Sequence, residues 1–356
     1  MPDVPPDPAA AQPVVAQLTN AALILVATVE SGGESTVREV LPDLPAIARS
    51  LAFRFPGSEL NAVVGFGSDA WDRLFAGPRP AGLHPFPELR GARHHAPATP
   101  GDLLFHIRAE RMDVCYEWAA QLLDRLGPAV TVVDETQGFR YLDHRDLLGF
   151  VDGTENPVGA GALAAALVGD EDPRFAGGSY VIVQKYVHDL AAWNELSTEE
   201  QERVIGRTKF TDTEYPDDVK APDSHVALNT ITKPDGTSRE ILRANMPFGS
   251  FERGEFGTYF IGYAADPDVA EQMLRNMFLG SPPAMHDRIL DFSTAVTGTL
   301  FYAPGAEFFD APPSPAATAV EAPSEPAPVP SLVRTAVADR PDDGSLHIGS
   351  LQESAT

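Results

Sequence analysis

The strongest constraint on the fold is the order of apolar strands and amphipathic helices, because one order occurs twice. In the first half, strands are predicted at residues 21–30, 61–67, 102–108 and 130–133, with helices at residues 35–50 and 111–126. In the second half, the strands are residues 180–186, 240–243, 258–263 and 299–302, and the helices are residues 197–205 and 268–277. Each half therefore follows the order strand, helix, two strands, helix, strand.

This order is typical of the ferredoxin-like fold, an α+β architecture with helices on one face of an antiparallel sheet. Residues 62–69 and 259–266 both run from an apolar strand into an acidic helix start, which supports a tandem repeat. We predict two such domains, with three Pro/Ala-rich or apolar flanking segments outside them. The predicted boundaries are 1–15 (disordered), 16–148 (first domain), 149–310 (second domain), 311–343 (flexible linker) and 344–356 (terminal peptide).

Charge and motif content exclude several classes of function. The chain has 26 Lys+Arg against 51 Asp+Glu, a net charge of −25, which repels nucleic acid and anionic lipid surfaces. The single cysteine, Cys115, cannot form an intramolecular disulfide. No secretory signal, membrane-spanning stretch, dinucleotide fingerprint, phosphate-binding loop or serine-hydrolase elbow is present. We expect a soluble cytoplasmic protein.

Two short stretches could carry chemistry. Residues 149–157 contain Asp-Gly and Asn-Pro turn formers, so Asp152 lies either on a plain surface turn or on a tight turn that faces a pocket, where it could relay protons. Arg243 and Asn245 would share one face of a presumed strand, because strand side chains alternate. The alternative for that strand is an edge-strand ion pair.

The nine histidines form no compact metal-binding pattern in the sequence, which disfavours zinc-hydrolase and polynuclear sites. A haem needs only one axial imidazole, so the spacing of the nine histidines in the sequence excludes none of them as a haem ligand. Trp71, Trp118 and Trp193 are predicted to be core residues rather than electron relays.

Taken together, residues 149–157, His225 within Ser224-His225-Val226, and Arg243 resemble the dye-decolourising peroxidases, in particular the bacterial B-type branch. The resemblance covers roughly residues 15 to 310, and it implies two ferredoxin-like domains with one haem b per subunit in the C-terminal one.

The resemblance also implies roles for individual residues. His225 would be the proximal ligand of the haem iron, and Asp152, Arg243 and Asn245 would lie on the distal side. Two further residues complete the implied set: Asp287, with Asp291 as the alternative, would accept the other N–H of the ligand imidazole, and Arg207 would bind a haem propionate.

The implied activity is reduction of hydrogen peroxide with electrons from dyes, phenols or other organic donors. Asp152 would act as the base, and the fixed charge of Arg243 would stabilise the anionic peroxide, so we expect the loss of Arg243 to be the more costly. One alternative is a haem-binding or haem-delivery protein, which needs no proton relay. A purely structural cargo protein, which would have no use for His225, is another.

The terminal peptide has three apolar anchors, Leu346, Ile348 and Leu351, in a polar, proline-broken tail. It resembles the peptide that docks cargo inside encapsulin shells, with the preceding linker as a tether. An encapsulin shell protein is therefore the predicted partner, and the predicted location is a nanocompartment in the cytoplasm. The family resemblance also suggests a homo-oligomer, for example a hexamer built from dimers.

Overall fold

The computed structural model describes residues 10–233 and 236–316. The predicted terminal peptide, with Leu346, Ile348 and Leu351, and most of the predicted linker lie outside the described residues. The prediction of disorder is wrong for residues 10–15. Gln12 there donates to the carbonyl oxygens of Val64 and Pro304, both at 2.9 Å, and this pairing with two strand regions fixes the segment despite its Pro/Ala-rich composition.

All strand pairings in the central sheet are antiparallel, as predicted for an α+β fold of this kind. Its ten strands join both halves, because β14 of the second half pairs with β2 of the first, Tyr302 opposite Phe66. The order β10-β12-β7-β14-β2-β5-β1-β6 is completed by β11 on β12 and β13 on β7. The strands are β1 (Ala21–Val29), β2 (Asn61–Gly67), β5 (Leu103–Ala109), β6 (Val130–Phe139), β7 (Ser179–His188), β10 (Leu242–Arg243), β11 (Met246–Ser250), β12 (Glu255–Ala264), β13 (Ser293–Ala295) and β14 (Thr299–Ala303).

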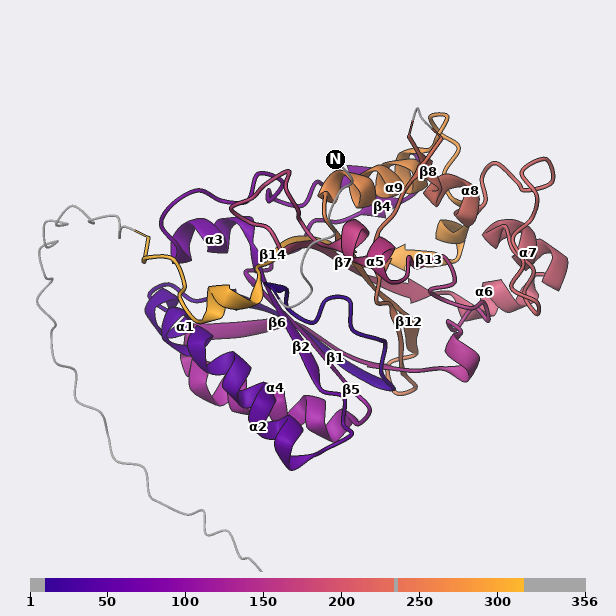
Figure 1. The fold of residues 1–356 in the computed structure, drawn as a ribbon. Coiled ribbons are helices and arrows are strands. Elements are labelled where there is room, and N and C mark those ends of the chain that lie inside the picture. The colour runs from indigo at the N-terminus through magenta and orange to yellow at the C-terminus, as the bar shows by residue number, and fades with distance from the viewer. Residues whose placement is uncertain (1–9, 234–235, 317–356) are drawn as a thin grey trace, which may run out of the picture. The chain divides into compact units, whose positions relative to one another are not determined.

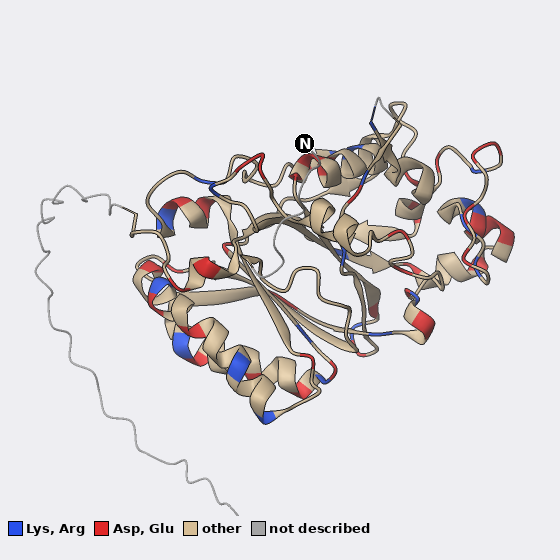
Figure 2. Cartoon of the chain, in the orientation of Figure 1, with Lys and Arg blue, Asp and Glu red and all other residues tan. Residues whose placement is uncertain are grey.

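The helices flank this sheet (Figure 1), and most charged residues belong to the helices and the loops (Figure 2). Helices α1, α2 and α4 belong to the first half and α9 to the second. The helices are α1 (Glu34–Val40), α2 (Leu44–Arg54), α3 (Ser68–Leu74), α4 (Met112–Leu126), α5 (Ala160–Ala166), α6 (Leu190–Glu195), α7 (Thr198–Ile205), α8 (His225–Asn229) and α9 (Pro267–Leu279). Two short hairpins, β3 (Leu89–Arg90) with β4 (His95–Ala96) and β8 (Ile231–Thr232) with β9 (Ser238–Arg239), complete the described strands.

Strand alternation places one core cluster on each face of the sheet, and a third, smaller cluster surrounds Trp193. Leu23 and Leu25 of β1 pack with the helix-side cluster, which includes Trp118 of α4 and Leu274 of α9. Ile24, between them, faces the opposite cluster, in which residues of both halves meet. Both halves therefore place their longest helix, α4 or α9, on the same sheet face, which confirms the predicted fold, whereas the short helix α5 packs on the other face.

The structure differs from the predicted elements where proline or a side-chain hydrogen bond interrupts them. The helix predicted at residues 35–50 is split into α1 and α2, with Pro42 and Pro45 at the start of the new helical segments, where a missing N–H costs nothing. The strand predicted at residues 240–243 is only Leu242–Arg243, and Asn245 lies outside it, because the Ile261 N–H donates to the Asn245 side chain instead of to a backbone carbonyl. Helices α5, α6 and α8 were not predicted.

Candidate active site

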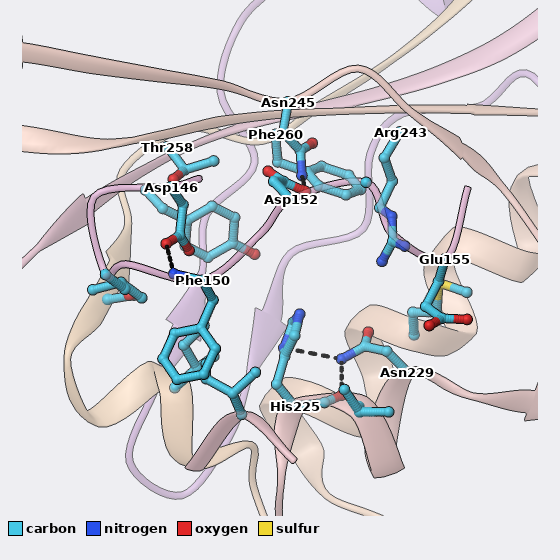
Figure 3. Close-up of a pocket in the computed structure, with 18 of the residues that line it drawn as sticks. Asp146, Phe150, Asp152, Glu155, His225, Asn229, Arg243, Asn245, Thr258 and Phe260 are labelled. Atoms are coloured by element: carbon cyan, nitrogen blue, oxygen red, sulfur yellow. Dashed lines mark hydrogen bonds between the residues drawn. The ribbon is translucent and has the colours of Figure 1, made fainter. Parts of the chain in front are cut away.

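A large cavity lies in the second half of the chain, between the turn at residues 146–155, strands β7 and β12, and helices α8 and α9. It encloses about 1130 Å³ of space free of protein atoms, solvent at its mouth included. Most of its lining is apolar, as is usual for a site that holds an organic cofactor or substrate. Figure 3 shows His225 on one side, pointing towards a group of polar side chains on the opposite side: Asp152, Asn245 and Arg243.

His225 is the first residue of helix α8, which begins at the Ser224 N-cap. Ser224 is fully buried, and Gly206 lies so close to it that a Cβ there would come within 2.9 Å of the Ser224 hydroxyl. Gly206 has φ +96°, so glycine serves both as the left-handed end of helix α7 and as the contact that seats α8. Local sequence thus places the imidazole at the cavity wall.

One nitrogen of the His225 ring is engaged by a buried carboxylate. Nδ1 lies 2.7 Å from Oδ2 of Asp287, whose side chain has no solvent exposure. The other Asp287 oxygen accepts from the Ile289 N–H at 3.0 Å, and Asn229, one turn along α8, donates to the His225 carbonyl at 2.8 Å. Burial lowers the pKa of His225, but the attraction of Asp287 outweighs it, so the net shift is upward.

The Nε2 atom of His225 has no hydrogen-bond partner among the described residues. His188, the other histidine in the described lining of the cavity, differs in this respect. Its Nδ1 lies 2.8 Å from the Ser293 hydroxyl and its Nε2 lies 3.1 Å from the Thr258 hydroxyl. Burial also lowers the pKa of His188 to about 4. His225 is therefore the histidine that offers a free ring nitrogen to the cavity.

The turn that carries Asp152 is not a plain surface turn, because it lines the cavity and is tied to strand β10. The Asn156 side chain accepts from the Arg243 N–H at 3.0 Å and donates to the Arg243 carbonyl at 2.8 Å. Asn245 donates to Oδ1 of Asp152 at 3.1 Å and so fixes the orientation of that carboxylate. The two sequence stretches predicted to carry chemistry therefore meet at one wall.

The Arg243 guanidinium is available to a ligand. Its Nε is buried without a hydrogen-bond partner, and its remaining nitrogens make no hydrogen bond or ion pair with any residue that the structure describes. A buried donor atom on a cationic group is costly unless something in the cavity satisfies it. An anionic or polarised oxygen is the group that suits it.

Asp146 is a cavity residue that the sequence analysis missed. One of its oxygens accepts from the Phe150 N–H at 2.9 Å. Burial, together with the neighbouring Asp152 carboxylate, raises the pKa of Asp146 to about 7. It lies six residues before Asp152 in the same segment, but no motif distinguishes it from an ordinary loop acid. The cavity wall near Asn245 therefore holds the carboxyl group of Asp146 beside that of Asp152, and Asp146 can carry a proton near neutral pH.

Arg207 also lines the cavity, but its guanidinium is already engaged. Its Nη1 lies 2.6 Å from Oε1 of Glu155 and its Nε lies 2.9 Å from Oδ1 of Asp212. The Arg207 side chain is 8% exposed. Asp291, the alternative partner considered for His225, makes no described hydrogen bond with that histidine; it pairs with His94 and His286 instead. Trp71, Trp118 and Trp193 are each at most 2% exposed, which confirms their prediction as core residues.

Comparison with known proteins adds independent information. The family models "Dyp-type peroxidase, N-terminal" and "Dyp-type peroxidase, C-terminal" match residues 11–140 and 143–308. The dye-decolorizing peroxidase of Mycobacterium tuberculosis is 59% identical over 343 residues, which cover 96% of this chain and 97% of that protein.

Two solved structures are similar over most of the described chain. The encapsulated DyP-type peroxidase from Mycobacterium smegmatis, solved by cryo-EM, is 61% identical, covers 86% of this chain and 99% of that chain, and superposes with a TM-score of 0.85. A variant of DypB from Rhodococcus jostii RHA1 in complex with heme is 55% identical, with coverages of 85% and 98% and a TM-score of 0.83. No helix among the described residues has the length and apolar content needed to cross a bilayer.

Proposed function

Because the chain belongs to the Dyp-type peroxidase family and is a haem peroxidase, we propose that it reduces hydrogen peroxide with electrons from organic donors such as dyes and phenols. The observation that carries the proposal is the two-sided cavity. A histidine with one free ring nitrogen faces a wall that holds a carboxylate, an amide and an unpaired guanidinium (Figure 3). A haem-delivery protein would have no need of that wall.

The residues of the cavity fit a haem. Nε2 of His225 would bind the haem iron, and Asp287 holds the other ring nitrogen, an arrangement that raises the basicity of a metal-binding imidazole. Side chains of α9, Met273, Leu274 and Met277, supply an apolar wall for the macrocycle. Arg207 would pair with a haem carboxylate in place of Glu155, which is 55% exposed and free to move away.

Haem supplies the two-electron reduction of hydrogen peroxide to water and the two one-electron withdrawals from donors that complete the cycle. Asp152 would hold the proton taken from one peroxide oxygen and return it to the other, with its carboxylate oriented by Asn245. Arg243 would stabilise the negative charge that develops on the departing oxygen, because it is a permanent cation whose donors are unpaired among the described residues.

The proposal is tested with the haem-loaded chain, hydrogen peroxide and a phenolic donor. We expect one peroxide to be consumed for every two one-electron oxidations of the donor, with a change in the haem absorption spectrum on addition of peroxide alone. If the chain binds haem but neither consumes peroxide nor changes its haem spectrum, a haem-delivery protein becomes the better explanation.

We further propose that the chain is packaged as a homo-oligomer inside an encapsulin shell. Two observations support packaging in the shell: the apolar anchors Leu346, Ile348 and Leu351, and the similarity to a peroxidase that is itself described as encapsulated. The predicted linker, residues 311–343, is rich in proline and alanine and would give the anchors reach.

Deleting residues 344–356 should abolish co-purification with the shell protein and leave peroxidase activity unchanged, because the deleted segment is far in sequence from every cavity residue. The measurement is the ratio of haem to shell protein after co-expression and size exclusion. A matched variant keeps the tail length and replaces the three anchors by serine. If both variants load into the shell as well as the wild type does, residues 344–356 are not the docking peptide. That result would leave the proposed peroxidase activity unaffected.

A further inference from the structure

Three potential metal-ligating side chains meet on the surface of the described chain, outside the cavity. Nε2 of His94 and Nε2 of His286 lie 3.2 and 3.1 Å from the same atom, Oδ1 of Asp291. The ligand atoms of all three residues lie within 4.8 Å of one another. Spacing along the sequence hides this cluster, because His94 belongs to the first half of the chain and the other two belong to the second.

We propose that His94, His286 and Asp291 form a binding site for a divalent transition-metal cation of the zinc class, distinct from the haem site and not required by the proposed peroxidase function. Two imidazoles and one carboxylate are a common protein ligand set for such ions, with water in the open position. The three side chains are 15 to 19% exposed, so the site is accessible to an ion and to a water ligand without being a fully solvated surface.

The spacing of the ligand atoms suits an ion between them. Zinc lies about 2.0–2.1 Å from histidine nitrogen and carboxylate oxygen, so two ligands in a tetrahedral arrangement are about 3.3 Å apart. The observed separations of 3.1 and 3.2 Å need little adjustment.

The backbone holds the three ligands in place. His94 lies in the β3–β4 hairpin, where its carbonyl accepts from the Gly91 N–H at 3.0 Å. Gly91 touches the end of α9 so closely that a Cβ would lie 1.9 Å from the carbonyl oxygen of Phe278. On the other side, the Asp287 N–H donates to the Met277 carbonyl at 2.9 Å, which anchors the 3₁₀ turn η5 (Arg288–Asp291) to the same helix.

Two arginine side chains lie beside the cluster, and their positive charge opposes the binding of a cation there. Arg288 Nε lies 3.0 Å from the second oxygen of Asp291, which leaves Oδ1 to the metal and holds the carboxylate in orientation. Arg93 lies 3.8 Å from Oδ1, but its side chain is 67% exposed and can turn into solvent. The overall charge of −25 favours cation accumulation around the molecule.

The site would join two parts of the chain. Asp291 ends the turn η5, and Asp287, the partner of His225, caps its beginning. An ion held by His94 from the first half would therefore clamp the β3–β4 hairpin to the turn that positions Asp287. This predicts a stabilising ion rather than a catalytic one.

The test uses the haem-loaded full chain, stripped with chelator, dialysed against zinc chloride and analysed for zinc by mass spectrometry. We expect one tightly held zinc per chain in the wild type, and at least about a 10-fold loss of zinc affinity in His94→Ala, His286→Ala and the shape-conserving Asp291→Asn. His95→Ala is the matched control, because His95 lies on the same hairpin but pairs with Glu88 instead. It should keep its zinc.

Two further measurements separate ligation from general disruption. Zinc should raise the melting temperature of the wild type and of His95→Ala, and leave that of the three ligand variants unchanged. His286→Cys, which supplies another zinc ligand, should retain the ion. The proposal is overturned if the wild type holds no more zinc than the ligand variants, or if the His95→Ala change removes zinc as effectively as His94→Ala. Either result leaves the peroxidase proposal untouched.

Discussion

Replacing Arg243 with leucine should slow the reduction of hydrogen peroxide by about 10³-fold, whereas replacing Asp152 with alanine should slow it by at most about 10²-fold. The guanidinium of Arg243 is the only free cation that the described lining presents opposite His225, since the other arginine, Arg207, is paired with acids. Nothing in that lining can replace its charge. Asp152, in contrast, has a second carboxyl group beside it.

Asp146 is the group that can substitute for Asp152. With a pKa of about 7, it is partly ionised at neutral pH and increasingly ionised above it. The residual rate of Asp152→Ala should therefore rise with pH as Asp146 loses its proton, and its midpoint should fall somewhat below 7, because the Asp152 charge that raises the pKa of Asp146 is gone. The double variant Asp152→Ala, Asp146→Asn should lose this residual rate.

The measurement is the second-order rate of the haem absorbance change after rapid mixing with peroxide, taken from pH 5 to 9 in each variant. Arg243→Lys serves as a matched control, because it keeps the charge but loses the planar fork, and its rate should fall between those of the wild type and Arg243→Leu. Haem content is measured for each variant, so that loss of cofactor is not mistaken for loss of rate. A slow Asp152 variant beside a fast Arg243 variant would contradict the ordering.

The fold was largely predictable because it depends on periodicity. The strands and the longer helices have enough residues for alternation or a 3.6-residue repeat to appear, as in α4, where Val114, Trp118 and Leu122 are all buried. Helix α8 has only five residues, too few to show a repeat, and its start depends on a serine cap instead. The pairing of β14 with β2 connects distant segments, so local patterns could not reveal it.

The candidate site was predictable only where chemistry and turn signals coincide in one stretch. The Asp152 turn stood out by its Asp-Gly and Asn-Pro pairs, but its tie to Arg243 through Asn156 depends on contacts between residues far apart in sequence. Resemblance to a family, not spacing, selected His225 among nine histidines. Asp146 lies beside the same turn and was missed, because burial, not sequence, is what raises its pKa.

His225→Ala should abolish peroxidase turnover and remove the imidazole signature from the haem spectrum. The physical reason is the arrangement of ring nitrogens in the cavity. His225 has a free Nε2, whereas both nitrogens of His188 are held by hydroxyl groups, so no other histidine of the described lining can replace the lost ligand without breaking two hydrogen bonds. His188→Ala is therefore the matched control, and its haem spectrum should keep the histidine-ligated form.

Added imidazole should restore the ligated spectrum of His225→Ala, because the substitution leaves a ring-sized space beside Asp287 that can accept the N–H of free imidazole. Asp287→Asn tests the same contact from the other side. It keeps the size of the side chain but removes the buried charge, so it should retain haem and lose about 10- to 100-fold in activity. If histidine ligation survives in His225→Ala but is lost in His188→Ala, the haem ligand is His188. The assignment of the Asp152 and Arg243 wall to peroxide would then be wrong as well.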